Sequence, residues 1–312
     1  MSLQIFQNSA LRSLISLAVG PSSGAGLSKS DGMLERPAAA AINHPNTFML
    51  TVDITPKSPS QFTALAWDIF FASRGRGISP AVNLGWFDDP QAYFVTVRDG
   101  QQVVAGLGVR PVKCRGGEYV AGIVGLVCVH AAQRSRGHAQ TALLAAISEA
   151  ARLGIHDLIL WTGQPAVYQR LGFMLQDGEC SGWVSGDVKA EASAPPVRSD
   201  WPESGSFRGL PAFALRGHHW SAPDATAVVI EDAAGPMLCE WRGSDDAVAQ
   251  LLGQVMPARW RLHVLTDDSL PGMLTAKGWT VDLAPSPLRM VKPLRAKQGP
   301  ADPYRLRLLD RI

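Results

Sequence analysis

The segment from Gly122 to Phe173 has the most regular pattern of apolar and polar positions in the chain. Residues 123–129 read Ile-Val-Gly-Leu-Val-Cys-Val and are apolar at both phases of a two-residue period, which is typical of a strand buried on both faces. A short polar segment follows, and apolar side chains then return at helical spacing, at Ala139, Ala142, Leu143, Ala146, Ile147 and Ala150. The pattern predicts a central strand, a tight basic loop and an amphipathic helix.

The residues around this unit predict more strands of the same sheet. A helix is expected after Pro59, and residues 74–90 are expected to form a loop because of their Gly and Pro content. Asp99-Gly100 is a strong turn signal and joins two of the strands as a hairpin. Strands are expected at 49–54, 92–98, 102–109, from Tyr119 onward, at 158–161, and as a closing pair over 174–184.

Composition changes after residue 185. Residues 186–205 are rich in Ala, Pro, Ser and charge without apolar periodicity, which predicts a linker. The following pattern predicts strands at 225–231, 237–241, 260–265 and 288–291, with helices at 247–255 and 270–277. This order repeats that of the first half. The sequence therefore predicts an α/β protein with a mixed central sheet flanked by helices, followed by a smaller α/β domain.

The expected limits are a first domain at 48–185, a linker at 186–205, a second domain at 206–295 and a C-terminal tail at 296–312. Residues 1–47 have the composition of a disordered or non-native leader, and Met33 and Met49 are alternative starts. A signal peptide in this region would need positive charge before its apolar core, and only Arg12 is available, inside the core.

Composition and charge exclude several classes of protein. The chain has 312 residues, of which 46% are hydrophobic, enough for two cores. A net charge of +2 gives no global attraction to nucleic acid, and no apolar run reaches the roughly 18 residues of a membrane span. Four cysteines without a CxxC pair indicate neither disulfides nor zinc, so we expect a cytoplasmic protein.

The basic loop has the properties of a phosphate site. A helix N-terminus presents unpaired N–H groups and the positive end of the helix dipole, and Gly137 lets an anion approach the backbone. Arg134 and Arg136 add two permanent cations, which suit a pyrophosphate. The loop matches neither the P-loop nor the dinucleotide-binding GxGxxG pattern.

Two motifs resemble those of the GNAT acyltransferase superfamily. Arg134-x-x-Gly137-x-Ala139, after a Val-x-Val strand, is similar to the acetyl-coenzyme A signature Q/R-x-x-G-x-G/A. The segment 168–173, Tyr-Gln-Arg-Leu-Gly-Phe, is similar to the family's Y-x-x-x-GF segment and lies in family order and spacing. The resemblance implies a GNAT-like fold and transfer of an acetyl group from acetyl-coenzyme A, a co-substrate, to an amine; no tightly bound cofactor and no metal are expected.

The resemblance also implies roles for particular residues. Val127 and Val129 would pair through their backbone with the pantetheine arm, and Tyr168 would lie beside the thioester sulfur as the proton donor to the leaving thiolate. The expected coenzyme A-binding residues are Val127, Cys128, Val129, Arg134, Ser135, Arg136, Gly137, His138, Ala139 and Gln140. Of these, the His138 side chain is expected at the surface, and Cys128 as a small buried residue rather than a nucleophile.

The general base is left open by the sequence. Many family members carry a glutamate near the position of Gly125, and this chain has no carboxylate between Glu118 and Glu149. Glu118, Asp88, Asp89 and a water chain are the candidates, and an amine can also lose its proton to solvent before attack.

The second half resembles a degenerate GNAT repeat. Its first helix is introduced by Gly243-Ser244-Asp245-Asp246, an acidic cap that would repel a pyrophosphate. Two hypotheses follow for the whole chain: an N-acetyltransferase, or a coenzyme A-binding sensor or interaction module without turnover. The acceptor stays open among small amines, aminoglycoside-like amines and protein amines, and so does the oligomeric state, with a homodimer as one alternative; no nucleic-acid or membrane partner is expected.

Overall fold

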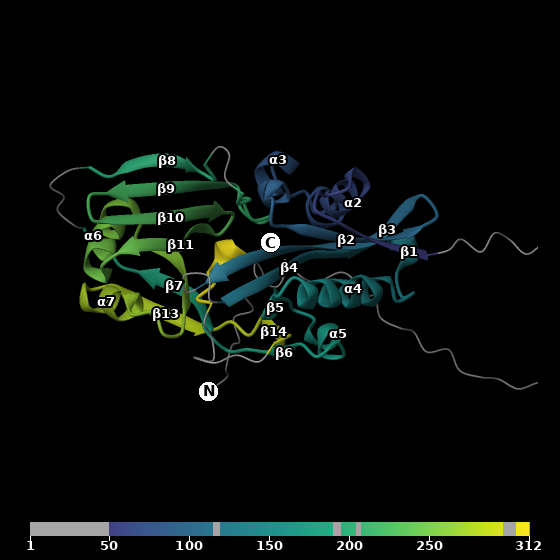
Figure 1. Ribbon diagram of the computed structural model, residues 1–312. Coiled ribbons are helices and arrows are strands. Elements are labelled where there is room, and N and C mark those ends of the chain that lie inside the picture. Colours follow the sequence, from purple (N-terminus) through teal and green to yellow (C-terminus); the bar gives the residue numbers. More distant parts are fainter. Residues whose placement is uncertain (1–49, 115–118, 190–194, 204–206, 296–303, 312) are drawn as a thin grey trace, which may run out of the picture.

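The computed structural model describes residues 50–114, 119–189, 195–203, 207–295 and 304–311, which form two seven-stranded sheets side by side (Figure 1). The predicted leader 1–47 and Glu118 lie outside these residues. Within them, no helix is long and apolar enough to cross a membrane. The first sheet contains, in spatial order, β1 (Leu50–Thr55), β2 (Tyr93–Asp99), β3 (Gln102–Cys114), β4 (Tyr119–Val129), β5 (Asp157–Trp161), β14 (Arg289–Pro293) and β6 (Met174–Leu175).

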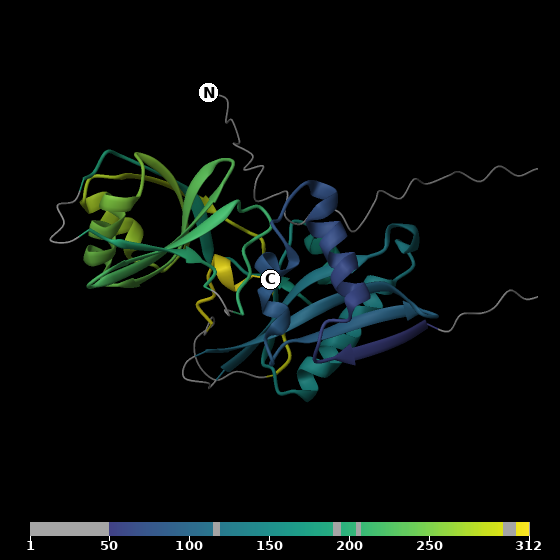
Figure 2. The ribbon, with the colours of Figure 1, turned by 90° about the horizontal axis from the view of Figure 1, so that it is seen from above.

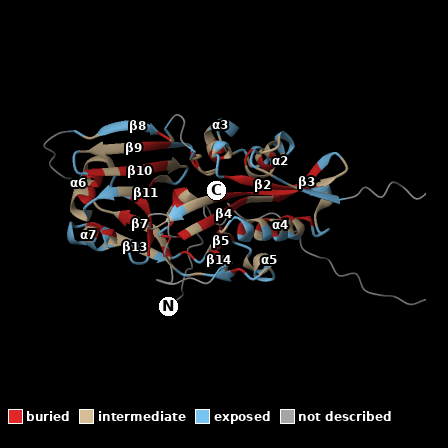
Figure 3. Ribbon diagram, in the orientation of Figure 1, coloured by how far each residue is buried: buried red, intermediate tan, exposed pale blue. Residues whose placement is uncertain are grey.

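Helices cover both faces of the first sheet. On one face α4 (His138–Arg152) buries Ala142, Leu143, Ala146 and Ala150 against the strands, at the spacing that the apolar pattern predicts. On the other face α2 (Ser60–Phe70) buries Phe62 and Ala66. Figure 1 shows α2 and α4 on opposite sides of the sheet, and Figure 3 shows buried residues running along β2 and β3 between them.

Among the described residues, the α-helices of the second sheet lie on one face. The sheet contains, in spatial order, β13 (Thr280–Pro285), β7 (Glu179–Ser185), β12 (Arg259–Leu265), β11 (Gly235–Gly243), β10 (Ala225–Asp232), β9 (Arg216–Ala222) and β8 (Val197–Trp201). Two helices, α6 (Asp245–Val255) and α7 (Leu270–Ala276), pack against one face of this sheet. The other face carries a core completed by Leu308 and Leu309 of the C-terminal segment, which lies between the two sheets (Figure 2).

The two halves exchange one strand each. β7 follows the first half in sequence but pairs with β12 and β13 of the second sheet, whereas β14 follows the second half but pairs with β5 and β6 of the first. The prediction that 174–184 closes the first sheet is therefore right for β6 and wrong for β7, and the placement of the last strand in the second domain is wrong. An apolar pattern encodes burial but not the identity of the pairing partner, and here the exchange interlocks the halves.

Regular elements also form in four segments where the sequence predicts none. The predicted linker 186–205 contains β8, and β9 and β13 lie where no strand is predicted. The predicted loop 74–90 contains α3 (Pro80–Asn83) and a 3₁₀ helix at Gly85–Asp88, and another 3₁₀ helix, Ala72–Arg74, ends at its first residue. The α3 helix begins at a Ser79 cap, whose hydroxyl accepts a hydrogen bond from the Val82 N–H at 3.3 Å.

Candidate active site

The two parallel strands at the centre of the first sheet separate part-way along their length. β4 and β5 pair at Ala121 with Asp157, Gly122 with Leu158 and Ile123 with Ile159, and no pair follows these. The remaining length of β4, residues 124–129, is paired only with β3. Backbone groups on the β5 side of this segment are therefore available to a ligand that enters between the strands.

A bulge in β4 accompanies the separation. Gly125 pairs with Gly108 and Cys128 with Gly106, so β4 has one more residue than β3 between the two pairs. Leu126 takes up the irregularity with φ = 52°. A bulge bends its strand and increases the local twist, and such features are common beside functional sites. The continuous apolar run at 123–129 gives no signal of the bulge.

A cavity of ≈ 190 Å³ lies where the strands diverge. β4 contributes Val124, Gly125, Leu126 and Val127, while β5 contributes Leu160 and Trp161. Tyr168 lines it from α5 (Pro165–Gln169). The remaining lining residues are Phe70, Phe71, Arg74, Asn83, Leu84 and Trp86 from the first half, and 209–213, Leu288, Leu308 and Arg311 from the rest of the chain.

The basic loop joins β4 to an uncapped helix N-terminus. Ser135 and Gly137 have φ of 63° and 83°, and the N-cap Gly137 provides no side chain for the first turn of α4. Arg136 is exposed, and Arg134 is half-buried with an Nε–H that has no hydrogen-bond acceptor among the described residues. Free N–H groups, the helix dipole and two guanidinium groups make this loop suitable for a pyrophosphate.

The other expected binding residues fall into two groups. Ser135 and Gln140 are exposed with the loop, and Ala139 is half-buried. Cys128 and Val129 are buried in the cores on opposite faces of the sheet, so only their backbone can meet a ligand. Burial also raises the pKa of the Cys128 thiol to about 12, so the thiol is protonated at neutral pH.

The expectation that His138 is a surface residue is wrong. Its side chain is 5% exposed, and its Nδ1 has no hydrogen-bond partner among the described residues. His138 stands four residues before Ala142 and so extends the buried stripe of α4 by one turn.

Tyr168 lines the cavity from α5. Its ring packs at 6.0 Å from that of Phe173, in an edge-to-face arrangement, and it contacts the main core of the first half. Burial raises the pKa of the Tyr168 phenol to about 12. The group is therefore protonated at neutral pH and able to donate a hydrogen bond.

Among the described residues, no Asp or Glu side chain lines the cavity. Asp88 and Asp89, the expected base candidates, do not line it, and Gly125 does. Within the described ranges, no group of three or more His, Cys, Asp or Glu side chains could hold a metal ion. Neither His218-His219 nor His263 belongs to such a group.

The second half supplies one wall of the cavity through a tight contact with α3. The amide of Asn83 donates to the Leu210 carbonyl at 2.8 Å, and the Leu210 N–H donates to the Val82 carbonyl at 3.0 Å. At Gly209 the approach is so close that a Cβ would lie 2.0 Å from the Asn83 carbonyl oxygen. Only glycine permits this approach.

A buried polar cluster stands behind the cavity. Trp161 Nε1 donates to the Glu179 carboxylate at 2.9 Å, and Arg311 contacts both Glu179 and His263 at 2.6 Å. Burial acts to raise the pKa of Glu179, but the charge of Arg311 and the interactions with His263 and Trp161 outweigh it and lower the pKa to about 2. Sequence reasoning missed this cluster because its members come from four distant segments.

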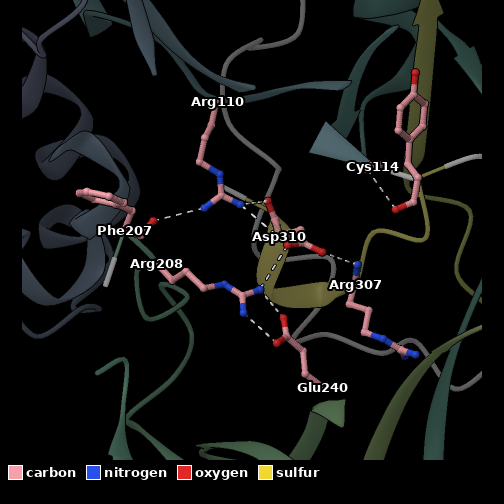
Figure 4. A network of polar contacts seen from close by, with 8 residues as sticks. Arg110, Cys114, Phe207, Arg208, Glu240, Arg307 and Asp310 are labelled. Atoms are coloured by element: carbon pink, nitrogen blue, oxygen red, sulfur yellow. Dashed lines mark hydrogen bonds and ion pairs between the residues drawn. The ribbon is translucent and has the colours of Figure 1, made fainter. Parts of the chain in front are cut away.

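A second network ties the C-terminal segment to both halves (Figure 4). The Arg110 guanidinium donates to the carbonyls of Phe207 and Asp310, at 3.3 and 3.1 Å. Arg208 pairs with Glu240 and with the Asp310 carboxylate. The segment that carries Leu308 and Arg311 to the cavity is thereby held from both sides.

Comparison with known families agrees with this geometry. Residues 60–173 match the model of the "Acetyltransferase (GNAT) family". The first half contains a GNAT-family domain. The match spans the diverging strands, the basic loop and the segment that ends at Phe173.

Solved structures of GNAT proteins share the fold. A conserved protein of Enterococcus faecalis, named as a probable N-acyltransferase, is 11% identical to this chain, with a TM-score of 0.58 over 79% of this chain and 73% of that one. A GCN5-related N-acetyltransferase of Anabaena variabilis is 13% identical, with a TM-score of 0.55 over 78% of this chain and 73% of that one. Eis1 of Mycobacterium abscessus is 14% identical, with a TM-score of 0.53 over 78% of this chain and 74% of that one. The share of this chain that these structures cover is larger than residues 60–173, so the structural likeness extends into the second half. No curated protein matches the sequence.

The second half is a GNAT-like unit with a different loop. Its strand order repeats that of the GNAT domain, including the single parallel pair, here β11 with β12. At the equivalent helix start, however, Ser244 caps α6 by accepting from the Ala247 N–H at 3.2 Å, and Asp245 and Asp246 occupy the first turn. A capping serine and two carboxylates thus stand where the first loop has a glycine and two arginines.

Proposed function

We propose that the protein transfers an acetyl group from acetyl-coenzyme A to a primary amine by direct attack in a ternary complex. The observation that carries the proposal is the combination of an uncapped, doubly basic helix N-terminus with a cavity at diverging strands that Tyr168 also lines. Pyrophosphate at the loop would direct the pantetheine arm between β4 and β5, toward this cavity. The thioester would then reach the acceptor there.

The residues would act as follows. The acceptor nitrogen attacks the thioester carbonyl carbon, a C–N bond forms, and the C–S bond breaks. The departing thiolate takes the phenolic proton of Tyr168, which the raised pKa keeps on the oxygen until then, and the phenolate regains a proton from solvent before the next turnover. Because no described carboxylate lines the cavity, the amine proton leaves to solvent, and positioning of the two substrates supplies most of the acceleration.

The competing proposal is a coenzyme A-binding module without turnover, and the absence of a lining carboxylate in the described part of the chain favours it. One experiment separates the two. Calorimetry establishes acetyl-coenzyme A binding, and a panel of primary amines is then screened for release of free thiol, with mass spectrometry of the acylated product. Binding together with an acylated product supports the enzyme, whereas binding with no product from any amine supports the module.

A further inference from the structure

Two polar side chains of the cavity wall, those of Asn83 and Arg311, form their hydrogen bonds within the protein. The Asn83 Oδ1 accepts from two backbone N–H groups, at 2.7 and 3.2 Å, and its Nδ2 donates to the Leu210 carbonyl at 2.8 Å. The Arg311 guanidinium contacts Glu179 and His263, each at 2.6 Å. Both groups therefore contribute to the structure of the wall and little to the binding of a polar ligand.

Among the described residues, the wall has no negative charge to receive a cation. Its charged lining residues are Arg74 and Arg311, and Arg74, like Arg311, already has an interaction within the protein. A protonated polyamine would lose its hydration here without gaining a counter-charge, and a carboxylate would have to compete for an arginine that is already engaged. A neutral monoamine avoids both costs, and desolvation favours this neutral form, which is the form that attacks the thioester.

Aromatic rings form much of the remaining lining. Phe70, Phe71, Trp86, Trp161 and Phe213 line the cavity. Its volume of ≈ 190 Å³ is slightly larger than the roughly 150 Å³ of a cavity known to hold benzene. The methyl group of an acetyl donor is too small to fill this space, so most of it is available to the acceptor. Apolar surface of this extent favours an apolar group of the size of a single ring.

Packing between aromatic side chains holds two of these rings in place before a ligand binds. The Phe71 ring stacks on that of Trp67, with centroids 4.7 Å apart and an angle of 9° between the planes. The Trp86 ring stacks on that of Phe94 at 5.6 Å and meets that of Phe87 edge to face at 4.5 Å. Rings that are already packed lose little conformational freedom on binding, which favours a rigid aromatic ligand.

We propose that the acceptor is a primary amine whose short alkyl chain carries one aromatic ring, without a carboxylate or a second ammonium group. This inference rests on the proposed acyl transfer and narrows its acceptor. The ring packs among Phe70, Phe71, Trp86 and Phe213, and the short chain extends toward Tyr168, where the nitrogen meets the thioester. The nitrogen attacks the thioester carbonyl carbon, the C–S bond breaks, and the amine proton leaves to solvent, as in the proposed transfer.

The test uses acetyl-coenzyme A with amines that differ from one another in single features. They are 2-phenylethylamine, ethylamine, which lacks the ring, L-phenylalanine, which adds a carboxylate, and spermidine, a polycation. We expect kcat/KM, measured as thiol release, to be at least about tenfold higher for 2-phenylethylamine than for each of the others.

Two variants test whether the ring lies in the cavity. Ala212→Phe adds a ring to a lining residue and should lower kcat/KM for 2-phenylethylamine about tenfold, with a smaller effect on ethylamine and an unchanged Kd for coenzyme A. Phe213→Ala removes a lining ring and should lower the ratio of kcat/KM for 2-phenylethylamine to that for ethylamine. Leu215→Phe is the matched control, because Leu215 is exposed and does not line the cavity, and it should keep the parental ratio. The melting temperature and the Kd for coenzyme A show whether each variant is folded.

A higher kcat/KM for ethylamine, L-phenylalanine or spermidine would overturn the inference, as would a parental ratio in folded Ala212→Phe or Phe213→Ala. Faster turnover of hexanoyl-coenzyme A than of acetyl-coenzyme A would also overturn it, because the cavity would then hold the acyl chain. If no amine releases thiol, acyl transfer itself fails, and calorimetry on coenzyme A-loaded protein still decides the inference: 2-phenylethylamine must bind, and must bind more weakly to Phe213→Ala.

Discussion

The carboxylate of Glu179 and the guanidinium of Arg311 meet at 2.6 Å, although 132 residues separate them in the chain. Glu179 begins β7, the strand that the first half inserts into the second sheet, and Arg311 belongs to the C-terminal segment that lines the cavity. Their contact therefore joins the strand exchange to the wall of the candidate active site.

This pair should make stability sensitive to acid. The pKa of Glu179 falls from 4.5 to about 2 on folding, so its contribution is fully present above pH 4.5 and is lost as the pH falls from 4.5 to 2. The loss is on the order of 3 kcal/mol. Urea denaturation between pH 5 and pH 3 should show a steeper loss in the parent than in Glu179→Gln. Asp177→Asn, which alters a carboxylate with no ion pair to the described residues, should keep the parental slope; a parental slope in Glu179→Gln would contradict the prediction.

Replacing Arg134 and Arg136 together with Ala should weaken coenzyme A binding at least tenfold. Each guanidinium would lose a charge-assisted contact with the pyrophosphate, worth roughly 1.5–3 kcal/mol. Calorimetry measures the Kd. Arg152→Ala is the control, because Arg152 lies at the other end of α4 and pairs there with Glu149 at 2.6 Å. An unchanged Kd in the double variant would place the pyrophosphate elsewhere.

Gly137→Val should impair coenzyme A binding and lower stability only through backbone strain, without unfolding the protein. No atom lies within 4 Å of the position of an added Cβ, so the substitution creates no clash in the protein, but φ = 83° is unfavourable for a β-branched residue. The side chain would also occupy the approach to the helix N-terminus. The Kd should rise while the melting temperature changes by only a few degrees. Normal affinity would show that the ligand does not approach this glycine.

Gly209→Ala should disturb the contact between the halves. Its Cβ would lie 2.0 Å from the Asn83 carbonyl oxygen, a distance at which the backbone has to move. We expect a lower melting temperature and a higher KM for the acceptor, because 209–213 line the cavity. Gly272→Ala in α7, where no atom lies within 4 Å of the added Cβ, is the control and should be neutral or stabilising. An unchanged melting temperature and KM in Gly209→Ala would show that the contact between Gly209 and Asn83 tolerates a backbone shift.

The sequence predicts the local elements of this fold well and its long-range pairings poorly. The unit of central strand, loop and helix is confirmed because its apolar periodicity is continuous over β4 and α4. The exchange of β7 and β14 is not predictable in this way, since either sheet could bury either strand. The same limit applies to the site: the basic loop is contiguous in sequence, whereas the cavity draws on Arg74, Gly209 and Arg311 from segments far apart.

The kinetics of Tyr168→Phe distinguish the hypothesis of an enzyme from that of a binding module. The change keeps the ring that packs against Phe173 and removes only the hydroxyl, so the Kd for coenzyme A should stay within a few-fold and the melting temperature should hold. If the phenol protonates the leaving thiolate, kcat should fall by roughly 10²–10⁴, the usual contribution of a general acid. Tyr119→Phe at the start of β4 removes a phenol that does not line the cavity and should leave kcat unchanged. Equal thiol release by Tyr168→Phe and the parent would reduce Tyr168 to a packing residue, and the thiolate would then have to take its proton from water.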